Sequence, residues 1–225
     1  MTSDLQKKPS ISVRPILQKK DRLLFEGDSL TAGLGNNYGR LLGWDKTWAD
    51  MVDEWLFLHR PELELECENH AVGGSSAKTM LARVDAALGF RPTVVLLTIG
   101  MNDVKLNVPV EMFREQLLDW CRKLQSAGCR TFLLVGGFSP CPNVDEETRA
   151  RLEGFRAYSE AGREVIEAQG GFYIDVAPYT VSRAEILDKR WSQHSVYSGG
   201  VHHNVVGNQL VAGAVLTYLG FWSPQ

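Results

Sequence analysis

Five short segments with the character of β-strands alternate along this chain with segments whose apolar residues recur at helical spacing. Strands that alternate with helices predict a mostly parallel sheet covered by helices on both faces. In such a sheet the carboxyl ends of the strands meet at one edge, where ligands bind. The predicted strands are residues 23–27, 63–67, 93–98, 131–135 and 172–176, and residues 93–98 are the clearest buried strand.

The segments between these strands predict the helices and the extent of the domain. We expect residues 1–21 to form an N-terminal arm, because they show little periodicity. Residues 22–225 are predicted to be a single domain, since no internal repeat, low-complexity tract or linker interrupts the pattern. Residues 99–103 are predicted to be a loop and residues 191–203 to be irregular. The predicted helices are residues 47–58, 77–88, 110–126, 146–168, 181–189 and 204–219.

Composition narrows the class of protein. The chain has 225 residues, 44% of them hydrophobic, which is enough for one sizeable core. Its formal net charge of -3, with mixed signs, gives no reason to expect binding to nucleic acid or to an acidic membrane surface. No apolar run approaches a membrane span, and the first 22 residues lack the apolar core of a signal peptide. The widely spaced cysteines are predicted to be free thiols in a reducing, cytoplasmic compartment: Cys67, Cys121, Cys129 and Cys141.

The stretch 23–33 combines a strand with a candidate nucleophile. Its apolar start turns sharply at Gly27-Asp28, and Ser29 then stands at the start of a predicted helix. A helix N-terminus offers unpaired N–H groups and the positive end of a dipole, which suit a developing oxyanion. The alternative is purely structural, because Asp28 or Ser29 could simply cap the helix.

Three further loops follow predicted strands and should reach the same edge of the sheet. They contain Gly73-Gly74, Asn102 and Phe138. Each has a common structural use when taken alone, Gly73-Gly74 as a turn and Asn102 as a cap or Asx-turn residue. Their convergence with Ser29 on one rim favours a functional site.

A histidine-containing stretch precedes the last predicted helix. It runs from residue 199 to residue 204 and contains His202 and His203. A neutral imidazole can accept a proton near pH 7 and return it to a leaving group, so His202 is the candidate base. His203 is the alternative base if the register is shifted by one residue. Surface or structural roles are assigned to His59, His70 and His194, and no metal site is inferred, because no paired Cys/His spacing is present.

Taken together, these blocks resemble the SGNH (GDSL-type) hydrolase family. The family's G-D-S-L motif is matched by residues 27–30, and its N-x-x-x-x-G motif by residues 69–74. Its G-x-N-D motif is matched by residues 100–103, and the end of its D-G-x-H-x-N block by residues 200–204. The blocks occur in family order, and the resemblance spans residues 23–219.

The resemblance implies a fold, a reaction and a set of site residues. The implied fold is a three-layer α/β/α sandwich with a mostly parallel, flavodoxin-like sheet of about five strands. Ser29 would be the nucleophile and His202 the base of a lipase-like acylhydrolase or esterase that needs no cofactor. The oxyanion hole would consist of the backbone N–H groups of Ser29 and Gly74 and the side-chain amide of Asn102.

One position departs from the family pattern. The family usually places an aspartate three residues before the histidine, and this chain has Gly199 there. Three explanations are open. In the first, a backbone carbonyl accepts the imidazole proton, as in some relatives. In the second, a carboxylate elsewhere, such as Glu185 or Asp188, orients the imidazole. In the third, most of the activity has been lost. The first is favoured, because the other roles remain filled.

The leading hypothesis is therefore a serine hydrolase that cleaves a small-molecule carboxylic ester, with a short acyl or O-acetyl group. No long apolar stretch suggests a lid or an acyl tunnel, and Phe138, Trp191 and Tyr197 could wall a small pocket. The alternatives are a catalytically idle binding protein of the same fold and, among enzymes, a lysophospholipase or a thioesterase. Formation of a homo-oligomer is left open.

Overall fold

A parallel sheet of five strands lies at the centre of the computed structural model, which describes residues 16–33, 46–138, 145–180 and 196–222. The strand order is β2-β1-β3-β4-β5, and every neighbouring pair is parallel. This is the predicted α/β fold with the strand order of flavodoxin-like sheets. The strands are β1 (Arg22–Gly27), β2 (Glu66–Asn69), β3 (Val94–Thr98), β4 (Thr131–Gly136) and β5 (Phe172–Asp175).

Burial along the strands follows their place in the sheet. Every residue of the central strands β3 and β4 is buried, because helices cover both faces there. The edge strand β2 is largely exposed and carries Glu66 and Glu68, whose charges discourage pairing with another chain. The strand order also places β1 beside β3. After β1 the chain continues to β2 on one side of this pair, and after β3 it continues to β4 on the other side. The crevice at their carboxyl ends is where this kind of sheet binds ligands.

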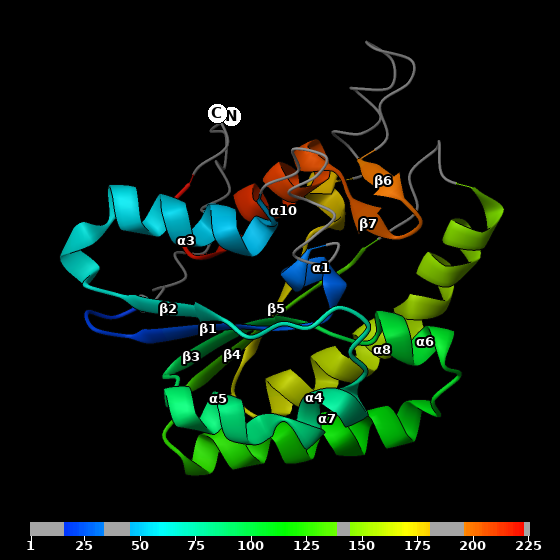
Figure 1. Ribbon diagram of the computed structural model, residues 1–225, viewed down its shortest axis with the longest axis horizontal. Helices are drawn as coiled ribbons and strands as arrows, with labels where there is room; N and C mark the ends of the chain where they lie inside the picture. Colours follow the sequence, from blue (N-terminus) through cyan, green and yellow to red (C-terminus); the bar gives the residue numbers. More distant parts are fainter. Residues whose placement is uncertain (1–15, 34–45, 139–144, 181–195, 223–225) are drawn as a thin grey trace, which may run out of the picture.

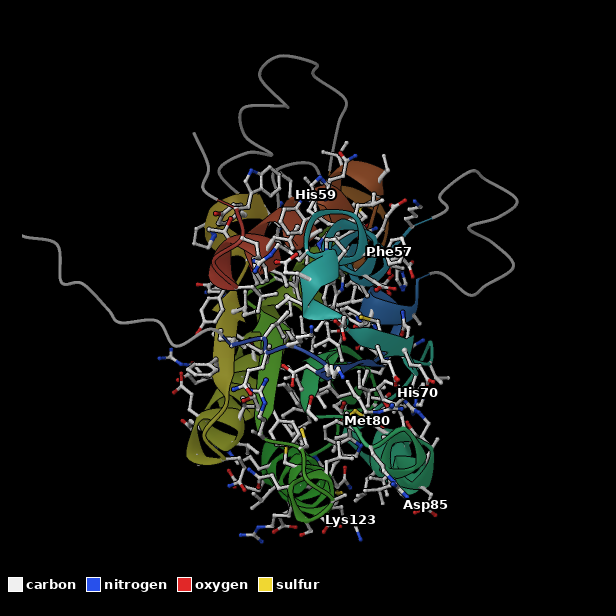
Figure 2. All side chains as sticks on the ribbon, turned by 90° about the vertical axis from the view of Figure 1, so that its left-hand side faces the viewer. Phe57, His59, His70, Met80, Asp85 and Lys123 are labelled. Carbon is white, nitrogen blue, oxygen red and sulfur yellow. The ribbon has the colours of Figure 1, made fainter. Side chains whose placement is uncertain are left out.

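Helices form a layer on each face of the sheet (Figure 1). The helices α3 (Trp48–His59) and α10 (Val205–Tyr218) pack together on one face. The other face is covered by α4 (Ala77–Ala82), α5 (Val84–Phe90), α7 (Val110–Ser126) and α8 (Glu146–Ala168). Figure 2 shows Met80 of α4 in the interior between helices and sheet, whereas Asp85 and Lys123 lie at the outer surface.

Several helices begin where the sequence provides a cap. The Thr47 side chain accepts a hydrogen bond from the N–H of Asp50, and the Asp50 carboxylate accepts one from the N–H of Thr47. The Asp145 carboxylate likewise accepts from the N–H of Thr148 at the start of α8. Such caps satisfy N–H groups that have no partner inside the helix. The predicted bounds of α7 and α8 agree with the structure.

The structure corrects four local predictions. The predicted loop at 99–103 contains a short helix, α6 (Met101–Lys105), and the predicted helix at 77–88 is two helices, α4 and α5, separated at Arg83. The strand predicted at 63–67 begins at Glu66, because a 3-10 turn, η1 (Pro61–Leu63), precedes it. Within the segment predicted to be irregular, β6 (Tyr197–Gly199) and β7 (His202–His203) form a small antiparallel pair. The helix predicted at 181–189 lies outside the described residues.

Only the end of the predicted arm, residues 16–21, is described. Ile16 and Leu17 are buried, and Arg130 donates hydrogen bonds to the Ile16 carbonyl and to Asp21. This end of the arm therefore packs against the domain. Among the cysteines in the described ranges, Cys67, Cys121 and Cys129 are free thiols, as predicted. None of the described helices combines the length and apolar character needed to cross a bilayer.

Candidate active site

The end of β1 packs so closely on the end of β3 that position 27 must be glycine. The backbone of Gly27 has a φ of 126°, and a Cβ there would lie 1.9 Å from the carbonyl oxygen of Thr98. Only glycine adopts this conformation without steric cost. The N–H of Asp28 also donates to the Thr98 carbonyl, at 3.2 Å. The chain is thereby turned sharply, and Ser29 is placed at the crevice between β1 and β3.

Asp28, and not Ser29, caps the short helix α1 (Ser29–Ala32). Its Oδ1 accepts a hydrogen bond from the N–H of Leu30 at 2.9 Å and one from the hydroxyl of Thr98 at 3.3 Å. Burial of Asp28 raises the pKa of its carboxyl to about 7. Asp28 therefore performs the helix-capping role that was the structural alternative for this motif. The Ser29 hydroxyl is not used as the cap.

His202 lies against Ser29, although 173 positions separate them in the sequence. Nε2 of His202 is 2.8 Å from Oγ of Ser29, which is hydrogen-bond distance. The hairpin of β6 and β7 lies beside α1 and carries His202 to this position (Figure 1). Both side chains are partly exposed, so a substrate can reach them. A serine and an imidazole at this distance have the arrangement that a nucleophile and its general base require.

The loop after β2 brings Gly73 and Gly74 to the same place. A Cβ added at Gly73 would lie 3.8 Å from Cβ of Ser29, and the space around Gly74 is open. In the part of the chain that the structure describes, no protein group accepts a hydrogen bond from the backbone N–H of Ser29 or Gly74. Two donors are therefore available beside the Ser29 hydroxyl.

Asn102, in the first turn of α6, is buried and held by two hydrogen bonds. Its Nδ2 donates to the carbonyl of Ser75 at 3.0 Å, and its Oδ1 accepts from Arg151 at 3.4 Å. The next residue, Asp103, accepts from the N–H of Ala77, and burial raises the pKa of its carboxyl to about 6. These bonds join the loop after β3 to the loop after β2. The amide of Asn102 is thereby tied to Ser75, the residue that follows Gly74, and Nδ2 carries a second N–H besides the one that Ser75 accepts.

His203 is not a base but a core residue. Its imidazole is 7% exposed and stacks on Tyr197, with the ring centroids 5.0 Å apart, while Phe138 packs at 5.3 Å. Neither ring nitrogen has a hydrogen-bond partner among the described residues. Phe138 and Tyr197, which were predicted to wall a small pocket, are buried and pack on His203. These contacts anchor the hairpin that carries His202.

Replacing His203 with phenylalanine is expected to make the protein less sensitive to acid. Burial lowers the pKa of His203 to about 3, whereas an unfolded histidine has a pKa of about 6.5. Between these values only the unfolded state binds the proton, so wild-type stability falls as the pH drops from about 6.5 towards 3. Phenylalanine does not titrate, so the stability of the variant lacks this pH dependence. In thermal melts, the unfolding temperature of His203→Phe relative to wild type should stay constant from pH 8 to about pH 7 and rise from about pH 6.5 down to pH 4.5. A difference independent of pH over the whole range would contradict this assignment.

Other candidate residues lie outside the described part of the chain. Glu185 and Asp188, the candidate orienting carboxylates, are among them, as are Trp191 and His194. Of the remaining histidines, His59 stacks on Trp55 and His70 pairs with Glu68, in line with surface or structural roles. Within the described ranges no group of three His, Cys, Asp or Glu side chains could hold a metal ion.

Sequence reasoning missed the polar side chains behind this site. Glu26 and Arg83 form an ion pair there, and Arg83 also reaches the Ser75 hydroxyl. A signal was present, because Glu26 is a charged residue at the end of an otherwise apolar strand. A buried carboxylate requires a cationic or hydrogen-bonding partner, which the pattern alone does not identify.

Comparisons with known proteins give the family and the fold. A family model described as GDSL-like Lipase/Acylhydrolase matches residues 25–210. A search of curated proteins finds no match. Three solved structures share the fold. A protein from Parabacteroides merdae described as a GDSL-like lipase has a TM-score of 0.73 at 18% identity, with 93% of this chain and 100% of that chain covered.

The second solved structure is that of LAE5, an α/β hydrolase enzyme from the metagenome of Lake Arreo, Spain. Its TM-score is 0.70 at 22% identity, with 92% of this chain and 99% of that chain covered. The third is a catalytic mutant of Axe2, an acetylxylan esterase from Geobacillus stearothermophilus. Its TM-score is 0.71 at 19% identity, with 92% of this chain and 97% of that chain covered. At these identities the likeness establishes a common fold.

Proposed function

The chain belongs to the GDSL-like lipase/acylhydrolase family, and we propose that it is a serine hydrolase that cleaves carboxylic esters. The observation that supports this most strongly is the 2.8 Å distance between Nε2 of His202 and Oγ of Ser29. An oxyanion hole made by the N–H groups of Ser29 and Gly74 and the amide of Asn102 is supported by two contacts. Gly73 approaches Ser29, and the Asn102 amide donates to the carbonyl of Ser75, the residue after Gly74.

The proposed reaction follows from these positions. Oγ of Ser29 attacks the acyl carbonyl while Nε2 of His202 accepts the hydroxyl proton. The carbonyl oxygen becomes an oxyanion, which accepts hydrogen bonds from the N–H groups of Ser29 and Gly74 and from Nδ2 of Asn102. The intermediate collapses, the C–O bond of the ester breaks, and His202 returns the proton to the leaving alcohol. Water then hydrolyses the acyl-enzyme by the same steps, with His202 again as base.

The residue three positions before His202 differs from the one at that spacing in Axe2. Structures of Axe2 include variants, described as catalytic mutants, in which a serine, a histidine or an aspartate three residues before that histidine is replaced. At the corresponding spacing this chain has Gly199, which pairs with His202 between β6 and β7. We propose that a backbone carbonyl takes the place of the carboxylate, so that Ser29 and His202 work as a dyad.

A short acyl group is the proposed substrate. Phe138 and Tyr197, predicted to wall a small pocket, pack on His203, the neighbour of His202 in the chain. Axe2, which shares the fold, is named as an acetylxylan esterase, so this fold is compatible with removal of an acetyl group. The free thiols at Cys67, Cys121 and Cys129 support a reducing, cytoplasmic location.

A series of p-nitrophenyl esters tests the reaction and the acyl length together. We expect kcat/KM to be highest for the acetyl and butyryl esters and to fall for the octanoyl and dodecanoyl esters. A maximum at the long chains would instead identify a lysophospholipase or thioesterase. No turnover of any ester by pure, folded protein would favour the idle binding protein.

A further inference from the structure

Arg83 joins three segments behind the candidate active site. It lies where α4 ends and α5 begins, and its guanidinium forms hydrogen bonds in three directions. Nη1 donates to the Ser75 hydroxyl at 2.8 Å, and Nη2 donates to Oε1 of Glu26 at 2.6 Å and to the carbonyl of Gly27 at 3.1 Å. One side chain thereby ties the end of β1 to the loop after β2.

The partner carboxylate is deeply buried. The side chain of Glu26 is 2% exposed, whereas that of Arg83 is 25% exposed. Burial raises the pKa of Glu26, and the guanidinium of Arg83 opposes this shift. Oε1 of Glu26 also accepts from the N–H of Gly27, at 3.0 Å. Arg83 therefore binds the carbonyl of Gly27, and Glu26 binds the N–H of Gly27, at the turn that leads to Ser29.

The bonds of Arg83 continue through Ser75 towards two of the three proposed oxyanion donors, and the bond to Gly27 holds the turn that precedes the third, Ser29. Ser75 follows Gly74 directly, and its carbonyl accepts the hydrogen bond from Nδ2 of Asn102. The Ser75 hydroxyl also donates to the carbonyl of Val72 at 2.7 Å, which closes the turn around Gly73 and Gly74. A shift of Ser75 would therefore move the N–H of Gly74 and the amide of Asn102 together.

We propose that Arg83 is a positioning residue, which sets the geometry of the oxyanion hole through Ser75 and Gly27. This rests on the proposed function of the same site. The guanidinium is suited to the task, because it is planar and presents several N–H donors in fixed directions. A lysine can keep the charge beside Glu26, but a single ammonium cannot reproduce the fork that reaches Ser75, Glu26 and Gly27. Small misplacements of catalytic donors lower the rate strongly, by roughly 100-fold for about 1 Å.

Replacing Arg83 with lysine is therefore expected to lower kcat for p-nitrophenyl acetate by roughly 10- to 100-fold, with little change in KM. Asn102→Ala alone should lower kcat by roughly 100- to 1,000-fold, because it removes one oxyanion donor. In the double variant, the loss should be smaller than the product of the two single losses, since Arg83 acts partly through Asn102. The matched control is Arg163→Lys on α8, where an exposed arginine pairs with Glu167. Its kcat should equal that of wild type.

A further variant separates positioning from stability. Arg83→Gln combined with Glu26→Gln removes both charges, so no unpaired buried charge remains. We expect this protein to fold and still to show the reduced kcat. A crystal structure of Arg83→Lys should also show the hydrogen bond from Nδ2 of Asn102 to the Ser75 carbonyl displaced or lost.

Wild-type kcat in folded Arg83→Lys would overturn the inference, as would an unchanged Ser75–Asn102 bond in its structure. Fully multiplicative losses in the double variant would do the same. These results differ from a failure of the proposed function, in which wild-type protein itself would neither hydrolyse the ester nor react with a fluorophosphonate.

Discussion

Replacement of Ser29 by alanine is expected to lower kcat for p-nitrophenyl acetate by on the order of 10⁵-fold. The change removes the oxygen that would attack the acyl carbonyl, 2.8 Å from Nε2 of His202. It should lower the free energy of unfolding by less than about 1 kcal/mol, because it deletes one partly exposed hydrogen bond. Asp28 supplies the cap of α1, so the helix keeps its start. Steady-state kinetics and a urea titration measure both effects.

The control for this substitution is Ser126→Ala. Its hydroxyl donates to the carbonyl of Arg122 within the exposed end of α7, and it should leave kcat unchanged. Substantial ester hydrolysis by pure, folded Ser29→Ala protein would mean that another group is the nucleophile.

Replacement of His202 by alanine is expected to lower kcat by roughly 10⁴-fold or more, because no other described group lies within hydrogen-bond distance of Oγ of Ser29 to take its proton. KM should change little, since the imidazole acts on the nucleophile. His59→Ala is the matched control, because His59 lies exposed at the end of α3 (Figure 2). Its ring stacks on Trp55. Equal losses in both variants would show that histidine removal acts through the fold.

The same assay decides which group orients His202. With a backbone carbonyl in that role, Glu185→Gln and Asp188→Asn should each keep most of the wild-type kcat. A triad carboxylate is worth about 10⁴-fold where nothing replaces it. A loss of that size in one of these two variants would therefore identify the carboxylate and exclude the dyad.

The long helices and the central strands could be predicted because their signals are local. In α7 and α8 the apolar residues keep one helical face over many turns, and Asp145 marks the start of α8. Residues 94–98 are apolar enough to require burial on both faces. The parallel arrangement followed from the alternation of strands and helices, and it placed four loops at one edge.

The errors occurred where contacts distant in sequence decide the conformation. Arg83 interrupts the helix predicted at 77–88 and forms bonds with Glu26 and Ser75, which no periodicity reveals. The loop prediction at 99–103 was wrong because α6 begins directly after Gly100, which turns the chain with a φ of 111°. The hairpin of β6 and β7 was missed because its strands are very short and depend on His203 packing between two aromatic rings.

The candidate site residues that belong to a sequence motif could be predicted. Ser29, Gly74, Asn102 and His202 were all identified from the sequence, and the structure brings them together at the crevice of the sheet. His203 is distinguished from His202 only by the alternation of side chains in β7, which directs one ring to Ser29 and the other into the core. The network behind the oxyanion donors carries no motif that the sequence analysis used.

Covalent labelling with a fluorophosphonate tests the central claim most directly. Attack by Oγ of Ser29 displaces fluoride and leaves a phosphonyl group on the serine, which intact-mass measurement and peptide mapping locate. We expect one adduct per chain on the peptide that contains Ser29, no adduct in Ser29→Ala, and much slower labelling in His202→Ala. Folded wild-type protein that stays unlabelled, or that carries the phosphonyl group on a different residue, would contradict the assignment of Ser29 as an activated nucleophile.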